Sequence, residues 1–175
     1  MAATKVKASV LHGARDLRLV SSSTFEALLL EPIFTFTQEE RELPPLGPKD
    51  VRVAIKSTGL CGSDLHYFNH FRNGDIIVRE PLTLGHESAG IITAVGSDVA
   101  ELQVGDHVAL EVGQPCEKCE LCVSGRYNIC REMRFKSSAK AYPHAQGTLQ
   151  DEIVHPAKWC HKYGSAYCSE LLMLY

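Results

Sequence analysis

The 175-residue sequence lacks the features that mark several common functional classes. No apolar run reaches the roughly 18 residues that a membrane-spanning helix needs. The opening MAATKVKASV has no apolar signal-peptide core, so we expect a reducing, cytoplasmic location. Basic residues are scattered and the net charge is −3, which disfavours nucleic acid or membrane as a partner. No G-x-G-x-x-G or G-x-x-x-x-G-K loop occurs, so we expect no dinucleotide-binding fold here. These absences favour small-molecule chemistry.

Cysteines are present in a pattern typical of a metal site. Four of the seven lie within residues 116–130, with two, two and seven residues between them: Cys116, Cys119, Cys122 and Cys130. A tetrahedral zinc site needs thiolates brought together by a tight turn, which Gly125 allows. Disulfides and an iron–sulfur cluster are the alternatives. The odd cysteine count and the reducing location disfavour disulfides, and the long last spacing does not match ferredoxin runs.

A second group of chemically active side chains lies upstream, in GLCGSDLHYF and LGHESAG. It contains Cys61, His86 and Glu87, with 24 residues between the cysteine and the histidine. A thiolate, an imidazole and a carboxylate are zinc ligands that leave one coordination position open in catalytic sites. On spacing alone, a buried structural cysteine and a satisfied histidine remain the more frequent explanations.

The periodicity of the sequence predicts mainly β structure. Strands are expected over residues 5–11, 51–57, 89–95, 106–112 and 148–155. The prolines of ELPPLGPKD predict an irregular connector, and a short helix is expected to begin near residues 62–64. Short strands of this kind favour a compact barrel or sandwich over a βαβ array.

The segments GLCGSDLHYF, LGHESAG and VGDHVA and the four-cysteine cluster occur in this order in zinc-dependent medium-chain dehydrogenases. The sequence resembles their N-terminal, GroES-like catalytic domain, and is most similar to the polyol branch, which includes sorbitol, xylitol and L-arabinitol dehydrogenases. The resemblance covers about residues 5–19 and 41–162. It implies a mainly β, partly open barrel with short helices and a zinc lobe, formed by residues 1–162.

This resemblance also implies two zinc sites. Cys61, His86 and Glu87 match the ligands of the catalytic zinc, which would polarise the hydroxyl of a polyol substrate while a nicotinamide cofactor, NAD(P), accepts the hydride. The cysteines of residues 116–130 match the ligands of the structural zinc.

Four further residues match functional positions of the family. Ser63 and His66 match a proton relay, Asp64 matches a carboxylate that orients the zinc-bound histidine, and Tyr67 matches a substrate contact. Each has a structural alternative: Ser63 or Asp64 caps the helix, His66 is simply exposed, and Tyr67 belongs to the core.

The sequence departs from the family pattern in two places. Residues 21–40 are an atypical insertion, either an added element or misannotated sequence. Residues 163–175 are a divergent tail where the family continues into a Rossmann domain, whose absence we expect to leave this chain inactive alone. The alternatives are a non-catalytic zinc-binding module and an unstable fragment, either of which could associate with intact family subunits.

Overall fold

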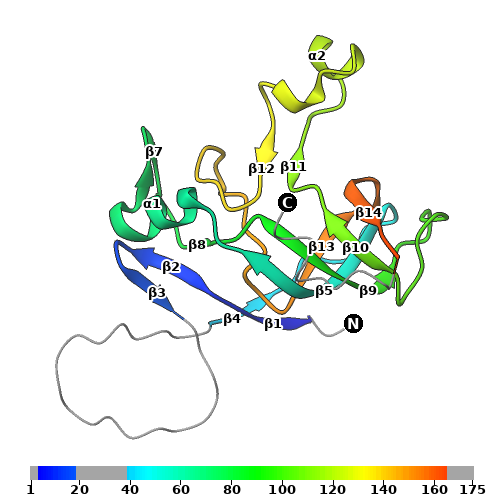
Figure 1. Cartoon of the computed structure of the whole chain (residues 1–175), viewed down its shortest axis with the longest axis horizontal. Coiled ribbons are helices and arrows are strands. Elements are labelled where there is room, and N and C mark those ends of the chain that lie inside the picture. The colour runs from blue at the N-terminus through cyan, green and yellow to red at the C-terminus, as the bar shows by residue number, and fades with distance from the viewer. Residues whose placement is uncertain (1–3, 19–38, 165–175) are drawn as a thin grey trace, which may run out of the picture.

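A computed structural model describes residues 4–18 and 39–164 of the chain (Figure 1). The insertion predicted over residues 21–40 and the tail predicted over 163–175 fall almost entirely outside these ranges. No helix among the described residues is long and apolar enough to cross a membrane.

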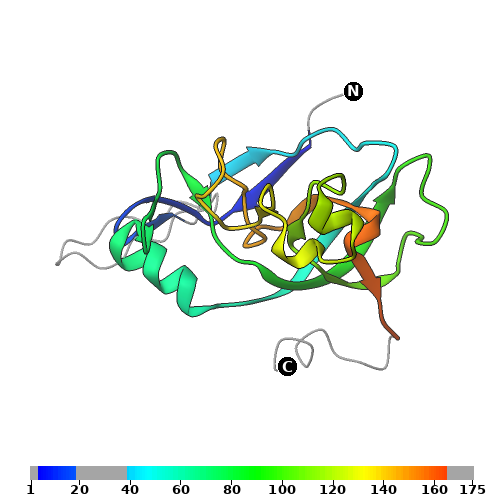
Figure 2. The same cartoon turned by 90° about the horizontal axis from the view of Figure 1, so that it is seen from above.

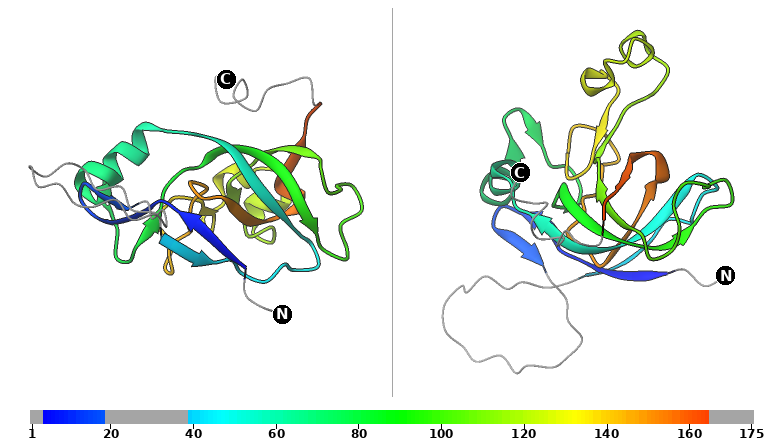
Figure 3. Two further views of the ribbon diagram at one scale, coloured as in Figure 1. Left: turned by 90° about the horizontal axis from the view of Figure 1, so that it is seen from below. Right: turned by 45° about the vertical axis from the view of Figure 1, so that its right-hand side comes forward.

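The main element is a five-stranded antiparallel sheet, which curves strongly in all views (Figures 1 and 3). Its strand order is β13 (Glu152–Pro156), β5 (Asp50–Gly59), β9 (Glu87–Val95), β10 (His107–Leu110) and β14 (Cys160–Lys162). One turn of 3₁₀ helix, η2 (Ala157–Trp159), joins the two edge strands β13 and β14. The described part of the chain is thus mainly β with short helices, as the sequence predicts.

Smaller sheets surround this one. They are β1 (Lys5–Ala8) with β4 (Glu39–Glu42); β3 (Asp16–Arg18), β2 (Val10–Gly13) and β8 (Leu82–Thr83); β6 (Arg72–Asn73) with β7 (Ile76–Ile77); and β11 (Gly113–Gln114) with β12 (Arg134–Phe135). The predicted strand over 148–155 begins only at Glu152. The N–H groups of Thr148 and Leu149 instead bond to the carbonyls of Gly85 and Leu84, which ties this segment to the loop before β9.

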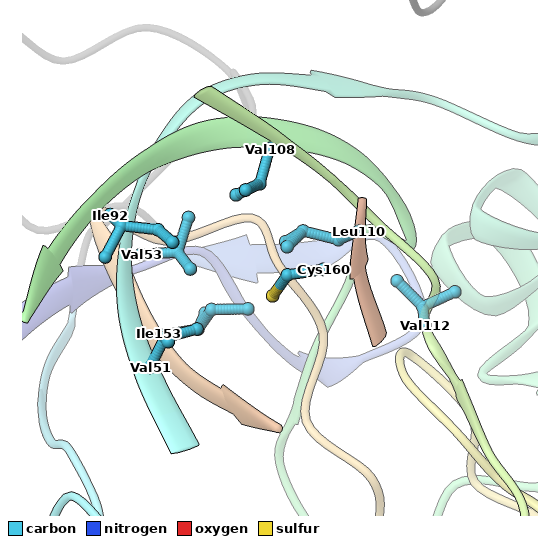
Figure 4. Close-up of a cluster of buried hydrophobic side chains, with 8 residues drawn as sticks. All are labelled: Val51, Val53, Ile92, Val108, Leu110, Val112, Ile153 and Cys160. Atoms are coloured by element: carbon cyan, nitrogen blue, oxygen red, sulfur yellow. The ribbon is translucent and has the colours of Figure 1, made fainter. Parts of the chain in front are cut away.

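Alternation along the strands builds the core inside the curved sheet. Val51 and Val53 are fully buried, whereas Arg52 between them is only partly so. They pack with side chains from the other four strands and the segment after β10, shown in Figure 4: Ile92, Val108, Leu110, Val112, Ile153 and Cys160. Each buried Val, Leu or Ile contributes about 1.5–3 kcal/mol, so this cluster is a major stabilising term for the sheet.

Helix α1 (Gly62–His70) lies at one end of the domain (Figure 2) and follows the last residues of β5. Its N-cap is Cys61, and the Asp64 carboxylate accepts the Cys61 N–H at 3.1 Å, as in a capping box. Ser63 is therefore not the cap, while Asp64 does bond the helix start. The helix ends at Phe71, whose left-handed backbone (φ 55°) directs its N–H to the Tyr67 carbonyl at 2.8 Å.

The β11–β12 ribbon carries a small lobe clear of the main sheet (Figures 1 and 3). The lobe contains α2 (Glu120–Val123) and η1 (Tyr127–Ile129). Gly125 turns the chain between them with φ 79°, as the sequence predicts. The ring centroids of Tyr127 in η1 and Trp159 in η2 lie 5.2 Å apart, so the lobe contacts the segment between β13 and β14.

Candidate metal centres

Cys61, His86 and Glu87 come together in the structure. A ligand atom from each lies within 4.8 Å of the other two. Cys61 stands at the start of α1, His86 ends the loop after β8, and Glu87 is the first residue of β9. The 24 residues that separate the cysteine from the histidine form α1 and the β6–β7 hairpin, which fold back so that the two ends meet.

A buried carboxylate holds the histidine in place. Asp64 Oδ1 lies 3.4 Å from His86 Nδ1, and both side chains are at most 10% exposed. Asp64 also accepts hydrogen bonds from the N–H of Cys61 (3.1 Å), the N–H of Gly85 (3.3 Å) and the hydroxyl of Ser137 (3.0 Å). Because Nδ1 faces the carboxylate, Nε2 is the nitrogen available to an ion. This arrangement matches the carboxylate–histidine pairs that support metal ligands.

The contacts within the cluster favour the charged forms of Cys61, Asp64 and His86. The Asp64 carboxylate, 3.4 Å from His86 Nδ1, raises the pKa of His86 to about 9, against the opposing effect of burial. Burial alone would raise the pKa of Asp64, but the bonds from His86 and the Cys61 N–H hold it below its usual value. Hydrogen bonds from Ser63, followed by His86, lower the pKa of the Cys61 thiol. A zinc ion would therefore have to displace a proton from His86 Nε2, whereas the lowered pKa of Cys61 favours the thiolate that binds metal.

The donor set fits a catalytic zinc ion. One sulfur, one nitrogen and one carboxylate oxygen are three ligands of the mixed type found in open sites. Glu87 is exposed, so solvent or a substrate can reach the fourth position. Gly59 pairs with Glu87 across β5 and β9, and a Cβ at Gly59 would lie 2.5 Å from Glu87 Oε2. The missing side chain at Gly59 thus leaves room for the carboxylate.

The remaining predicted residues differ in their placement. Ser63 Oγ lies 3.5 Å from His86 Nε2, beside the cluster. His66 is on the exposed face of α1, where its ring lies 6.2 Å from the ring of His70. Tyr67 is 2% exposed and its hydroxyl accepts the Ala139 N–H at 3.3 Å, which agrees with the core alternative. The relay and substrate roles of these three residues stay predictions.

Two residues of the site were not foreseen from the sequence. The Phe135 ring packs edge-on against the His86 ring, with centroids 5.5 Å apart, and Ser137 bonds Asp64. Both come from the segment that returns from the lobe, about fifty residues after His86. No local motif distinguishes them, because only the β11–β12 pairing brings this segment over the site.

The four cysteines of residues 116–130 also converge. Their sulfurs all lie within 4.8 Å of one another, and the six cysteines of the described residues are free of disulfides. The sulfur–sulfur distances are 3.4 Å for Cys119–Cys122 and 3.9 Å for both Cys116–Cys122 and Cys119–Cys130. A zinc–sulfur bond of about 2.3 Å places tetrahedral sulfurs about 3.8 Å apart. The cluster therefore fits a zinc ion and leaves no open position.

The thiols of this lobe are not equivalent. Backbone N–H groups, first that of Lys118, lower the pKa of Cys116 to about 7, whereas desolvation and the neighbouring sulfurs raise that of Cys122 to about 12. Four crowded thiolates need a compensating cation, which zinc supplies when it binds.

Comparison with known proteins agrees with this geometry. The family model described as "Alcohol dehydrogenase GroES-like domain" matches residues 47–165, which is well over half of the chain. The chain belongs to this GroES-like family. The match confirms the predicted fold class and the resemblance to zinc-dependent medium-chain dehydrogenases.

Curated relatives of this GroES-like domain are named as polyol-type dehydrogenases. The chain is 51% identical over 120 residues to an L-idonate 5-dehydrogenase of Vitis vinifera and equally to a sorbitol dehydrogenase of Arabidopsis thaliana, covering 69% of this chain and 32% of each relative. It is 46% identical over 137 residues to a probable D-xylulose reductase A of Emericella nidulans, with 78% and 37% covered. The chain thus spans about a third of the length of these relatives, and they confirm the polyol branch.

Solved structures of dehydrogenases share the fold of this chain at lower sequence identity than the curated relatives do. The L-idonate 5-dehydrogenase of Escherichia coli superposes with a TM-score of 0.80 at 25% identity, covering 99% of this chain and 44% of that one. The galactitol-1-phosphate dehydrogenase of Escherichia coli superposes with a TM-score of 0.71 at 29% identity, covering 96% and 41%.

Proposed function

We propose that this chain forms the substrate-activating domain of a zinc-dependent polyol dehydrogenase, which interconverts a sugar alcohol and a ketose. The observation that carries the proposal is the meeting of Cys61, His86 and Glu87 in front of the buried Asp64. The names of the relatives, sorbitol dehydrogenase and D-xylulose reductase among them, support a polyhydroxylated substrate.

Two zinc ions per chain follow from the two clusters, one catalytic and one structural. A catalytic zinc would supply Lewis acidity toward a substrate hydroxyl, and a nicotinamide cofactor would accept the hydride. Cys61, His86 and Glu87 would hold the ion, while Asp64 keeps the imidazole oriented and increases its basicity. The cysteines of the lobe would hold the second ion and stabilise the fold rather than contact substrate.

The chain itself offers a route for the hydroxyl proton. Ser63 Oγ lies beside His86 Nε2, and a hydroxyl can accept one proton while it donates another. His66, exposed on the next part of α1, would then release the proton to water. In this proposal Ser63 and His66 move the proton, and Tyr67 supports the helix from the core side.

The residues proposed here act on the substrate, and none of them binds the nicotinamide cofactor. The sequence has no glycine-rich dinucleotide loop, so we propose that this polypeptide alone does not turn over sorbitol or xylitol. Cysteines that hold zinc as thiolates must stay reduced, which favours the cytoplasm as the location. Association with intact family subunits would restore a cofactor site nearby.

Metal analysis of single-site variants tests the assignment. Purified chain should contain two zinc ions, and Cys61→Ser should contain one. Serine is a favoured N-cap, so the variant should keep α1 folded, which circular dichroism checks. Cys160→Ala serves as the control, because Cys160 is a buried cysteine outside both clusters, and it should retain two ions.

The same metal analysis distinguishes a catalytic zinc centre from the alternative of a non-catalytic zinc-binding module. One zinc ion in the wild-type chain, unchanged in Cys61→Ser, would mean that only the cysteine lobe binds metal and would refute a catalytic centre. Cobalt-substituted chain gives a second readout: its visible spectrum should change when sorbitol or xylitol is added and should not change in Cys61→Ser.

A further inference from the structure

A cavity of about 270 Å³ lies outside both metal clusters, between the end of β4, the β11–β12 ribbon and β13. Its lining is rich in positive charge, with Arg41, Arg134 and Lys136 on its walls, and Glu42 as the acidic side chain. None of the seven proposed zinc ligands lines it. The cavity is therefore a separate feature of the fold.

Residues 134–136, which are β12 and the residue after it, contact both this cavity and the Cys61 cluster. Successive strand residues point to opposite faces. Phe135 packs against His86, while its neighbours Arg134 and Lys136 line the cavity. The same short segment thus contributes one wall to each site.

Lys136 is the unusual member of the group. Burial, followed by the charge of Arg134, lowers its pKa to about 8. Within the described part of the chain, no hydrogen bond contributes to this pKa. Lys136 is half-buried, and the cost of its partly desolvated charge falls when an anion enters beside it.

Two arginines line the same cavity as this lysine, and each guanidinium group donates a hydrogen bond to another segment. Arg134 Nη2 donates to the Pro143 carbonyl at 2.8 Å, and Arg41 Nη1 donates to Gln146 Oε1 at 2.7 Å. Each guanidinium carries five N–H donors in a rigid fork that suits the oxygens of a phosphate. Fixing the forks in advance reduces the entropy lost when an anion binds.

His144, which also lines the cavity, adds no charge. Its Nε2 accepts the Arg79 N–H at 2.9 Å, so its Nδ1 carries the proton and donates to the Ala141 carbonyl at 2.8 Å. The charge of the cavity therefore comes from two arginines and a lysine, opposed by the exposed Glu42.

We propose that this cavity binds a small dianion of the phosphate class, either inorganic phosphate or the phosphate group of a small monoester. Three basic side chains and one carboxylate line the cavity, so an anion there lies among more basic than acidic groups. The volume is below the usual 300–1,000 Å³ of drug-sized ligand sites, which favours a small anion.

Calorimetry with the zinc-loaded chain tests the proposal, using sodium phosphate and glycerol 3-phosphate against sodium chloride of equal ionic strength. Phosphate should bind saturably, and Lys136→Met should weaken binding at least tenfold. Lys56→Met, which removes an exposed lysine of β5 away from the cavity, should bind phosphate as the wild type does. Without phosphate, Lys136→Met should melt at or above the wild-type temperature, since it removes a partly desolvated charge.

Phosphate could also bind at the zinc of the other site, so the titration is repeated with Cys61→Ser, in which unchanged affinity is expected. Loss of binding in that variant would assign the phosphate to the metal and overturn the proposal, whatever the outcome for the proposed function. Equal affinity in wild type and Lys136→Met, or a response that sodium chloride reproduces, would also overturn it. Glycerol 3-phosphate that binds as well as phosphate assigns the cavity to monoesters, and binding of inorganic phosphate alone assigns it to the free anion.

Discussion

The two metal clusters of this domain are built in opposite ways. The cysteine lobe takes four identical ligands from 15 consecutive residues and presents them on a ribbon that stands clear of the sheet. The Cys61 cluster takes three different ligands from two distant segments and rests on a buried carboxylate. A closed set of thiolates suits a structural ion, and an open mixed set suits chemistry. The ligands of one cluster are brought together by a short stretch of chain, and those of the other by the tertiary fold. Experiments on each cluster can test this difference.

The largest effect is expected in the lobe. Cys119→Ser should lower the zinc content from two ions to one and unfold the lobe, since coordination energy of order 10 kcal/mol is also folding energy there. Metal analysis and limited proteolysis within residues 116–130 measure both results. Ser124→Ala, at the C-cap of α2 and outside the ligand set, should keep both ions. Full zinc content in Cys119→Ser would contradict a four-cysteine site.

The second largest effect is expected from the buried Asp64 carboxylate, which supports only one of the two clusters. Asp64→Asn should weaken zinc at the Cys61 site by about 10- to 100-fold and leave the lobe unchanged, because an amide cannot support both His86 and its three other donors. Competition with a chromophoric chelator resolves the two affinities. Asp75→Asn is the control, since this carboxylate is exposed and pairs only with Arg72 within the described chain. Equal weakening at both sites would show that Asp64 acts on global stability alone.

The pH dependence of stability tests a residue of the main sheet, His155 of β13, that belongs to neither metal cluster. Burial, followed by the charge of Lys136, lowers the pKa of His155 from 6.5 to about 3. Between these values the unfolded chain binds a proton that the folded chain does not. The stability that His155 contributes is therefore complete above about pH 6.5 and is lost as the pH falls toward 3, by at most about 1.4 kcal/mol per pH unit.

Urea unfolding at pH 7 and pH 5 measures this dependence. His155→Gln keeps a donor for the Glu111 carbonyl, which His155 Nε2 contacts at 3.1 Å, but does not titrate. The loss of stability on going to pH 5 should be smaller in His155→Gln than in the wild type by about 2 kcal/mol. The same loss in both proteins would mean that other groups, the metal ligands included, account for the acid sensitivity.

The smallest effect concerns the aromatic contact at the Cys61 site. Phe135→Leu should lower zinc affinity there by tenfold or less, since an aromatic pair contributes about 0.5–1.5 kcal/mol beyond its buried area. Tyr142→Leu removes an exposed ring outside both clusters and should have no effect on zinc. A change of a hundredfold in Phe135→Leu would assign this residue a larger role than packing.

Sequence patterns predicted the elements that depend on neighbouring residues. The VRVAIKS alternation became β5, and the cysteine spacing with Gly125 became the lobe, because both follow from short-range geometry. The strand expected over 148–155 was placed too early, since its first residues bond to the loop at Gly85 instead of joining the sheet. Cys61, and not Ser63, proved to be the helix cap, a detail that depends on the backbone angles at the end of β5.

The sequence by itself determined the ligand types, the cysteine knuckle and the mainly β class, because these depend on side-chain chemistry and on contacts between near neighbours. The family resemblance predicted that Asp64 orients His86, and the two side chains do lie 3.4 Å apart. Only the tertiary structure decided that Phe135 and Ser137 join the site and that Lys136 lies in a cationic cavity. These contacts link residues more than twenty positions apart. Such contacts depend on which distant segments the fold brings together, and a short stretch of sequence does not specify that choice.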